Sequence, residues 1–166
     1  MPCLRKKLFI TGAVICLILG GWCFYRAFQL RGPPEVAWRA LRAPQHMTLY
    51  SIDPDRRFGQ PIAPGSFHEF RVLGEAVITD QPAQRAVVRA IEDAVCRSGS
   101  QKACFDPRHG VRVTTGADTF DFLICFECSK IHVYSGDQFV AETTISDSPQ
   151  ALNALLREAK LPIAAR

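Results

Sequence analysis

Apolar residues recur every three or four positions in two stretches of the chain, the spacing that buries one face of a helix. The first stretch follows Asp80, a favourable N-cap, and ends near Gly99, which permits the left-handed geometry that stops a helix. The second begins at Ser148 as N-cap and ends before Pro162. The two apolar stripes comprise Val87, Val88, Ile91, Ala94, Val95 and Ser98, and then Leu152, Leu155, Leu156 and Ala159. We therefore predict two main helices, and a short third helix after Pro34.

Between these helices, β-branched and aromatic residues alternate with polar ones at the period of two that strands show. The strand-like stretches are residues 47–52, 67–79 with a bend or bulge at Gly74, 111–115, 119–126, 130–135 and 138–146. In the fourth stretch Phe120, Phe122, Ile124 and Phe126 share the face expected under the helices. The order predicts an α+β fold with β-β-α-β-β-β-β-α connectivity, in which the two main helices pack on one face of an antiparallel sheet of five or six strands.

Residues 8–25 form an apolar run without a charge, directly after Arg5, Lys6 and Lys7. As a helix this run would span roughly 27 Å, about the thickness of a bilayer core. A cleaved signal peptide is the alternative, but small residues do not precede a cleavage point, and Trp22 and Tyr25 suit a membrane interface instead. We expect a retained transmembrane helix, with the rest of the chain outside the cytoplasm and periplasmic in a bacterium.

This anchor divides the chain into four expected parts. They are a basic tail (1–7), the transmembrane anchor (8–25), a juxtamembrane linker with the short helix (26–45) and a globular α+β domain (46–166). The formal net charge of +4 comes from four basic residues before residue 29, and the remainder holds equal numbers of acidic and basic residues. A nucleic-acid partner is therefore not expected, because phosphate binding needs a gathered positive charge. The expected partners are the membrane and a protein of the cell envelope.

Reactive side chains concentrate in CFDPRHG, which holds Cys104 and His109, and in CFEC, which holds Cys125 and Cys128. With Cys96 on the preceding helix, four cysteines allow three disulfide pairings that the sequence does not separate. Helical spacing places Cys96 away from the apolar stripe, and its pairing with Cys104 would leave Cys125 and Cys128 as a second pair.

The CFEC pair is open to three interpretations. A structural role, by disulfide or packing, is favoured over a metal site, and a metal site over thiol redox chemistry. Thioredoxin-type dithiols lie at a helix N-terminus, whereas this pair follows a strand and encloses Glu127. For metal binding, Cys104, His109, Cys125 and Cys128 would supply a tetrahedral Cys3His set suited to zinc. No cofactor is otherwise expected.

Two neighbouring side chains have further possible roles. His109 could act as an acid or base, but a turn histidine satisfied by a backbone group is the favoured interpretation. Arg108 could bind an anionic ligand or pair with Asp106 or Glu127. The sequence contains no nucleophile elbow, phosphate loop, dinucleotide fingerprint or paired-histidine metal motif, so a catalytic residue is not assigned and an enzyme is not favoured.

The segments CFDPRHGV and FDFLICFEC resemble a group of short, exported or membrane-attached bacterial proteins of uncharacterised function, over roughly residues 47–163. The resemblance includes Cys104, His109, Cys125 and Cys128 but does not require Cys96. It implies that Cys104 bridges to the CFEC pair instead of Cys96.

Two functions follow as hypotheses. The first is a membrane-anchored extracytoplasmic domain that binds or supports an envelope partner and is stabilised by disulfide or metal chemistry. The second is a thiol redox or metal-handling protein in which Cys125 and Cys128 act directly.

Overall fold

The computed structural model describes residues 35–55, 64–95, 101–146 and 148–164. A compact unit covers residues 33–166, and all the described residues belong to it. The expected transmembrane anchor, residues 8–25, lies outside the described residues. Among those that are described, no helix has both the length and the apolar character needed to cross a membrane.

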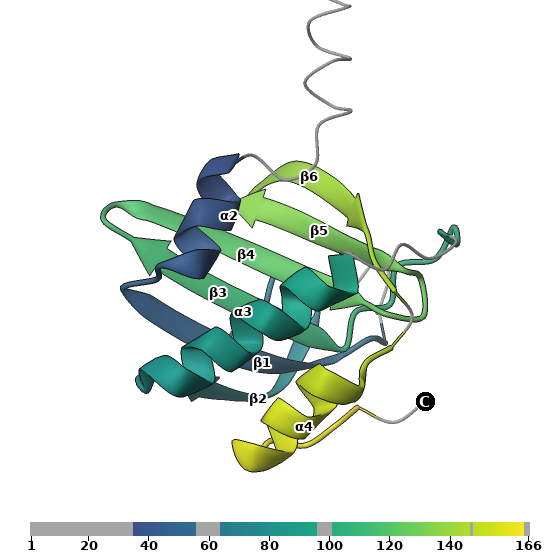
Figure 1. The fold of residues 1–166 in the computed structure, drawn as a ribbon. Coiled ribbons are helices and arrows are strands. Elements are labelled where there is room, and N and C mark those ends of the chain that lie inside the picture. Colours follow the sequence, from purple (N-terminus) through teal and green to yellow (C-terminus); the bar gives the residue numbers. More distant parts are fainter. Residues whose placement is uncertain (1–34, 56–63, 96–100, 147, 165–166) are drawn as a thin grey trace, which may run out of the picture. The chain divides into compact units, whose positions relative to one another are not determined.

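Six strands and three helices make up the described part of the chain, an α+β fold (Figure 1). The helices are α2 (Glu35–Arg42), α3 (Gln81–Val95) and α4 (Gln150–Glu158). The strands are β1 (His46–Asp53), β2 (Arg71–Val77), β3 (His109–Thr115), β4 (Asp118–Cys125), β5 (Lys130–Ser135) and β6 (Gln138–Thr144). The predicted order of strands and main helices is confirmed.

The strands form one antiparallel sheet in the order β2-β1-β3-β4-β5-β6. Two tight hairpins join β3 to β4 and β5 to β6, and Gly116 and Gly136 adopt positive φ angles of 59° and 56° in their turns. Glycine tolerates this geometry without the steric cost that a Cβ would bring. The bend or bulge predicted at Gly74 is confirmed as a bulge: Ser51 of β1 pairs with Gly74 and Ile52 pairs with Val72, so the register skips Leu73 of β2.

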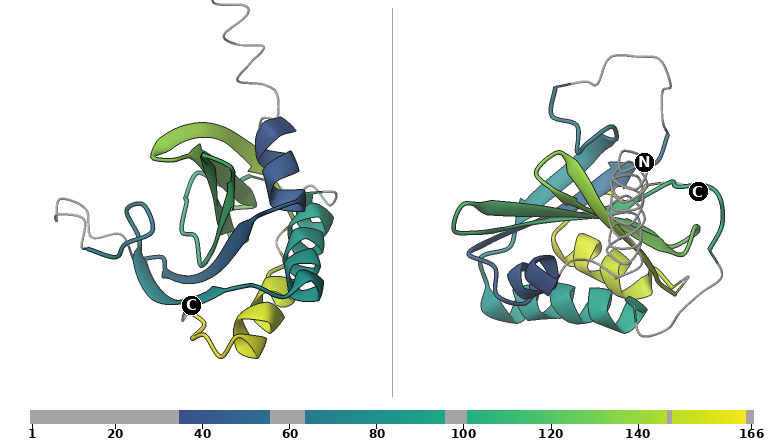
Figure 2. Two further views of the ribbon diagram at one scale, coloured as in Figure 1. Left: turned by 90° about the vertical axis from the view of Figure 1, so that its left-hand side faces the viewer. Right: turned by 90° about the horizontal axis from the view of Figure 1, so that it is seen from above.

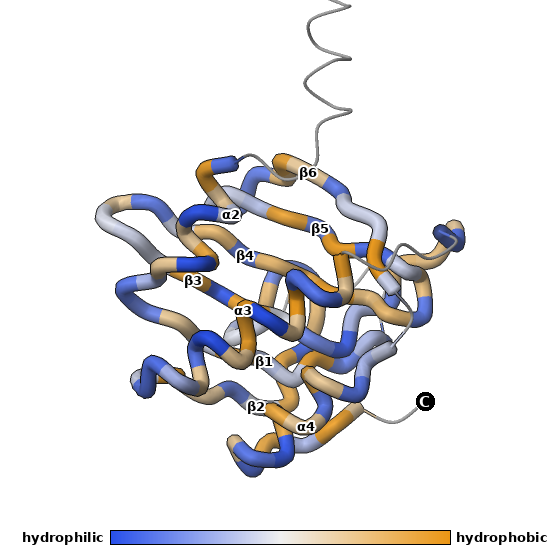
Figure 3. The backbone as a smooth tube through the Cα atoms, viewed as in Figure 1, coloured by the Kyte–Doolittle hydropathy of each residue, from blue (hydrophilic) through white to orange (hydrophobic). Residues whose placement is uncertain are grey.

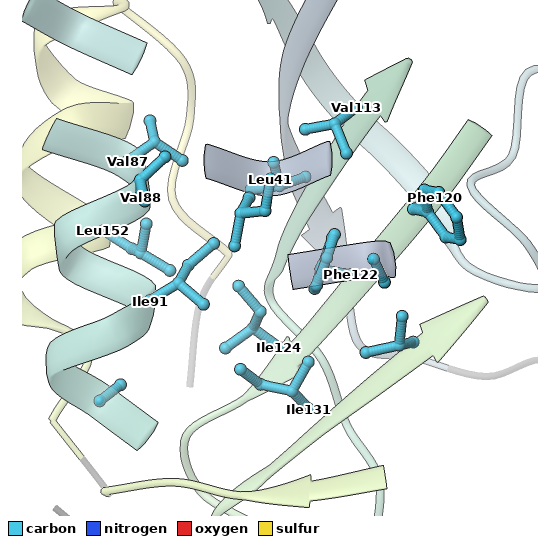
Figure 4. Packing of buried hydrophobic residues seen from close by; sticks show 14 of the residues in the cluster. Leu41, Val87, Val88, Ile91, Val113, Phe120, Phe122, Ile124, Ile131 and Leu152 are labelled. Carbon is cyan, nitrogen blue, oxygen red and sulfur yellow. The ribbon is translucent and has the colours of Figure 1, made fainter. Parts of the chain in front are cut away.

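All three helices cover the same face of the sheet (Figures 1 and 2). Their apolar sides meet the inward residues of the strands in one core, drawn in Figure 4. The core includes Leu41 from α2, Val87, Val88 and Ile91 from α3, Leu152 from α4, and Phe120, Phe122 and Ile124 from β4. The short helix α2 thus packs against the domain, an alternative that the sequence left open beside a position on lipid headgroups.

The amphipathic pattern of α3 accounts for its place in this core. Apolar and hydrophilic stretches alternate along its backbone in Figure 3. Its N-terminus is capped as predicted, because the Ala83 amide donates a 2.8 Å hydrogen bond to Oδ2 of Asp80. The predicted cap of α4 is wrong: Pro149 occupies the N-cap position, and among the described residues no side chain caps the helix.

The opposite face of the sheet carries a second, smaller apolar cluster. It contains Tyr50, Ile52, Phe67, Phe70 and Leu123. Residues 64–70, joined by a Phe67–Phe70 bridge, supply two of its members, and Phe105 packs at its margin. Both faces of the central strands are therefore buried, so the period-two pattern does not divide core from solvent there.

Candidate functional site: the three-cysteine cluster

The cysteine cluster lies where β4 ends and the chain turns into β5. Cys125 is the last residue of β4, and Cys128 and Ser129 complete the turn, with the Ser129 amide donating a 3.1 Å hydrogen bond to the Phe126 carbonyl. Residues 101–108 run past this turn without helix or strand structure. Backbone hydrogen bonds fasten that segment to the turn and sheet, from Lys102 to the Cys128 carbonyl at 3.2 Å and from Arg108 to the Ile124 carbonyl at 3.3 Å. These bonds position Cys104 beside the CFEC turn.

Three sulfur atoms meet at this point. Cys125 and Cys128 form a disulfide, and the Cys104 Sγ lies 2.8 Å from the Cys128 Sγ. Both disulfide cysteines are buried, with exposed fractions of 1% and 0%, whereas Cys104 is exposed and forms no disulfide with a described cysteine. The cluster therefore combines an internal disulfide with a surface thiol in direct contact with one of its sulfurs. The Cys125–Cys128 pairing was one of the pairings that the sequence left open.

Backbone amides point at both disulfide sulfurs. The Cys128 amide donates to the Cys125 Sγ at 3.1 Å, and the Asp106 amide donates to the Cys128 Sγ at 3.4 Å. Hydrogen bonds of this kind favour negative charge on the sulfur that accepts them. The Asp106 carboxylate opposes this effect, because one of its oxygens lies within 4.8 Å of the Cys104 and Cys128 sulfurs.

The sulfur contact bears on the zinc hypothesis. Within the described residues, the group of metal-ligand atoms that lie within 4.8 Å of one another is Cys104, Asp106 and Cys128, and His109 is not in it. Zinc with Zn–S bonds of about 2.3 Å holds tetrahedral sulfurs roughly 3.8 Å apart. The 2.8 Å separation of Cys104 from Cys128, together with the Cys125–Cys128 bond, means that zinc binding would need the disulfide reduced and the sulfurs parted.

His109 is the first residue of β3 and points away from the sulfurs toward the helical layer. Its Nε2 lies 2.8 Å from Oδ1 of Asn153 on α4, and its ring meets Phe126 edge-on at 5.4 Å. Burial lowers the pKa of His109 to about 4, against a smaller raising effect of the Asn153 hydrogen bond. The imidazole is therefore neutral at physiological pH. The predicted turn histidine with a backbone partner is wrong, because the partner is a side chain on a distant helix.

Arg108 forms an ion pair with Glu127, whose Oε2 lies 3.0 Å from its Nη1. This is one of the two pairings that the sequence offered as an alternative to binding an anionic ligand. The pair joins the 101–108 segment to the CFEC turn, next to the sulfur cluster. Phe105 adds a further attachment, because its ring stacks on His132 of β5 at 3.5 Å between ring centroids.

A buried charged network on the second face of the sheet was not anticipated from the sequence. Asp121 on β4 is fully buried and accepts two 2.7 Å hydrogen bonds from Arg112 on β3, and its Oδ2 lies 2.8 Å from the His68 Nε2. The guanidinium also lies over the Phe67 ring, 5.1 Å from its centroid. The available signal was an acidic residue inside the largely apolar strand sequence DTFDFLIC.

Cys96, a candidate disulfide partner for Cys104, lies outside the described residues. The disulfide contacts that can be described are therefore those among Cys104, Cys125 and Cys128. Comparison of the chain with family models, curated proteins and solved structures finds no match.

Proposed function

We propose that this protein is a thiol–disulfide exchange protein in which Cys104 carries the reaction between a buried disulfide and the surface. The observation that supports this function is the 2.8 Å contact between the exposed Cys104 sulfur and the Cys128 sulfur. Exchange begins when a thiolate attacks a disulfide sulfur, so a thiol resting against a disulfide is already at the start of the reaction.

The internal step moves the disulfide without changing its oxidation state. The Cys104 thiol loses its proton to solvent, and the thiolate attacks the Cys128 sulfur. A Cys104–Cys128 bond forms, the Cys125–Cys128 bond breaks, and the electron pair leaves on Cys125, which takes up a proton. The 3.1 Å hydrogen bond from the Cys128 amide stabilises the charge that develops on Cys125.

The second step involves a partner protein with two neighbouring thiols. One partner thiolate attacks the exposed Cys104 sulfur, releases Cys128 and leaves a mixed disulfide between the partner and Cys104. The other partner thiol then displaces Cys104. The partner dithiol is thereby oxidised to a disulfide, while the cluster gains two electrons and two protons and becomes three thiols; the reverse sequence reduces a partner disulfide.

Burial explains why a third cysteine is needed. External thiols cannot approach the Cys125 and Cys128 sulfurs, which are almost fully buried, without local opening of the turn. Transfer of the disulfide to Cys104 presents one sulfur of the bond at the surface instead. Thioredoxin-type proteins expose a reactive thiol at a helix N-terminus. In this protein the exposed, attacking thiol would instead be Cys104, which lies on a separate segment of the chain.

We further propose that this chemistry takes place outside the cytoplasm, with residues 8–25 as the membrane anchor. Two features of the sequence support the proposal: the charge-free apolar run after Arg5, Lys6 and Lys7, and a chain rich in cysteine. In such a compartment the partner would be another envelope protein, as the first hypothesis from the sequence also assumed.

The test compares the rates at which glutathione reduces the Cys125–Cys128 disulfide in the full-length protein and in Cys104→Ser. Peptide mapping after differential alkylation follows these cysteines separately from the other four in the chain. We expect reduction to be at least about tenfold slower in Cys104→Ser, because the glutathione must then wait for local opening. The control is Cys96→Ser, which should react like the unmodified protein.

Two results would contradict the proposal. Equal reduction rates with and without Cys104 would show that the third thiol has no part in exchange. A disulfide that persists in strongly reducing glutathione would give the cluster a structural role, the kind of role that the sequence favours, as a clamp for residues 101–108. Native mass spectrometry of the reduced protein, with and without added zinc, tests the metal alternative: a bound zinc ion lost in Asp106→Asn would identify a metal site.

A further inference from the structure

A small cavity lies on the helical side of the CFEC turn and borders the sulfur cluster at Asp106. Its volume is about 150 Å³, and none of the described cysteines lines it. Part of the wall is apolar and comes from Phe126, Pro149, Ile163 and Ala164. A cavity of this size accommodates a molecule about as large as a benzene ring. The cavity thus fits a small, compact ligand and excludes a peptide or a nucleotide.

The polar part of the wall is built around one imidazole. His109 and its partner Asn153 both line the cavity, and His109 is only 2% exposed. Because Oδ1 of Asn153 accepts a hydrogen bond from Nε2, the neutral ring carries its proton there. Its Nδ1 is then a hydrogen-bond acceptor, and among the described residues it has no partner. Buried acceptors are almost always paired in native proteins, by protein, water or ligand.

Three charged side chains line the cavity, namely Asp106, Arg108 and Glu127. Arg108 and Glu127 both contribute to the lining, but they neutralise each other in an ion pair at 3.0 Å. The Glu127 side chain is about half exposed, which places this pair at the solvent side of the cavity. Asp106 adds a negative charge that disfavours an anionic ligand, and its carboxylate lies within 4.8 Å of the Cys104 and Cys128 sulfurs. Beside the apolar wall, the acceptor without a partner among the described residues is the neutral His109 Nδ1, which an uncharged donor complements.

We propose that the cavity binds a small, uncharged, largely apolar molecule that carries one hydroxyl, such as a phenol or a short-chain alcohol, and that the hydroxyl donates to the Nδ1 of His109. The apolar body lies against Phe126 and Ile163. This site differs from the thiol chemistry in the atoms that would hold the ligand, which belong to His109, Phe126 and Ile163, although Asp106 borders both.

Phenol is the probe, and toluene, which has the same shape without the donor, is its control. Both are titrated into the isotopically labelled full-length protein, and NMR follows the imidazole of His109 and the methyl groups of Ile163. Signals at these two residues distinguish binding in the cavity from partitioning elsewhere on the protein. We expect saturable shifts with phenol and an affinity about tenfold higher than for toluene, the difference that one hydrogen bond to a buried acceptor makes.

Two variants separate the parts of the site. His109→Phe keeps an aromatic ring but removes the acceptor, and it should abolish the preference for phenol. Ile163→Phe fills the cavity while leaving His109 in place, and it should abolish binding of both probes; this residue lies outside the helices and strands. Equal affinities for phenol and toluene, unsaturable shifts, or phenol shifts that persist in Ile163→Phe would each overturn the proposal. So would a crystal structure that shows an ordered water on Nδ1 that phenol does not displace.

Discussion

Asp121 is held in its ionised form inside the sheet by hydrogen bonds to two neighbouring side chains, Arg112 and His68. Burial alone would raise the pKa of its carboxyl group, but the hydrogen bonds from Arg112 and His68 outweigh this effect and lower the pKa. Removal of the carboxylate would therefore leave a guanidinium and an imidazole in the second apolar cluster without their shared acceptor.

We predict that Asp121→Ala lowers the free energy of unfolding by about 3–5 kcal/mol, the cost of breaking a buried pair from one side. Chemical denaturation measures the change. Arg71→Ala, which removes an exposed partner of Asp53 on the rim of the sheet, is the matched control and should cost less than about 1 kcal/mol. Equal effects of the two substitutions would refute the importance of the buried network.

His109 gives the domain a pH dependence of known sign. Its pKa is lowered from 6.5 to about 4 in the folded state, chiefly by burial. Below pH 6.5 the unfolded chain binds a proton at this residue that the folded protein excludes until about pH 4, so stability falls as the pH falls through this window.

We predict that the lowered pKa of His109 reduces the free energy of unfolding by about 3 kcal/mol from the upper to the lower end of that pH window. Denaturation of the unmodified protein and of His109→Phe, measured at several pH values, isolates it, because the carboxyl groups titrate in both proteins and cancel in the difference. The variant should show the flatter dependence of stability on pH. Parallel curves for the two proteins would contradict the lowered pKa.

The helices differ in how their N-termini are held. Asp80 accepts a hydrogen bond from the Ala83 amide at the start of α3, whereas the hydroxyl of Ser148 before α4 bonds to the side-chain oxygen of Gln150. We predict that Asp80→Ala lowers the free energy of unfolding by about 1 kcal/mol and that Ser148→Ala changes it by less than about 0.5 kcal/mol. Thermal denaturation compares them, and a larger loss for Ser148→Ala would show that the hydroxyl does cap α4.

Much of this fold could be predicted from the periodic patterns of apolar residues in the sequence. The stripe of α3 and the alternation of Phe120 and Phe122 were correctly predicted to face each other, because periodic burial on one side leaves a regular pattern. The same rule missed Asp121, since residues 64–70 and Phe105 cover the second face and the alternation there no longer separates core from solvent.

The site was predictable as a set of residues and not as an arrangement. Clustering in CFDPRHG and CFEC marked Cys104, Cys125, Cys128 and His109. The contacts among these residues depend on backbone hydrogen bonds, such as the one from the Lys102 amide to the Cys128 carbonyl. They also depend on Asn153 of α4, which is far along the chain from its partner His109. Neither kind of contact has a sequence spacing that would reveal it.

The cluster also couples the position of its disulfide to the stability of the entire domain. The Cys125–Cys128 disulfide joins residues 3 apart, whereas a Cys104–Cys128 disulfide would join residues 24 apart. A disulfide stabilises the folded state by lowering the entropy of the unfolded chain. In this description the first disulfide contributes about 2 kcal/mol to the free energy of unfolding and the second about 3.5 kcal/mol.

The Cys125→Ser variant can form only the Cys104–Cys128 disulfide of this cluster, and Cys104→Ser can form only Cys125–Cys128. We therefore predict that oxidation raises the free energy of unfolding by about 1–2 kcal/mol more in Cys125→Ser than in Cys104→Ser. The quantity to compare is the difference in free energy of unfolding between the oxidised and reduced forms of each variant. This difference removes the effect of the substitution itself. A gain from oxidation that is equal in both variants would mean that Cys104 and Cys128 do not form a strain-free pair in the folded domain.

The central claim, that the disulfide moves between Cys125 and Cys104, is tested most directly by finding which cysteine is free in the oxidised full-length protein. Acid quenching stops exchange by removing thiolates, after which denaturation, alkylation and peptide mapping locate the unpaired thiol. We predict that the label divides between Cys104 and Cys125 and that Cys128 stays unlabelled, because Cys128 is the shared partner in both pairings. Label on Cys104 alone, unchanged after prolonged incubation at neutral pH, would contradict the account.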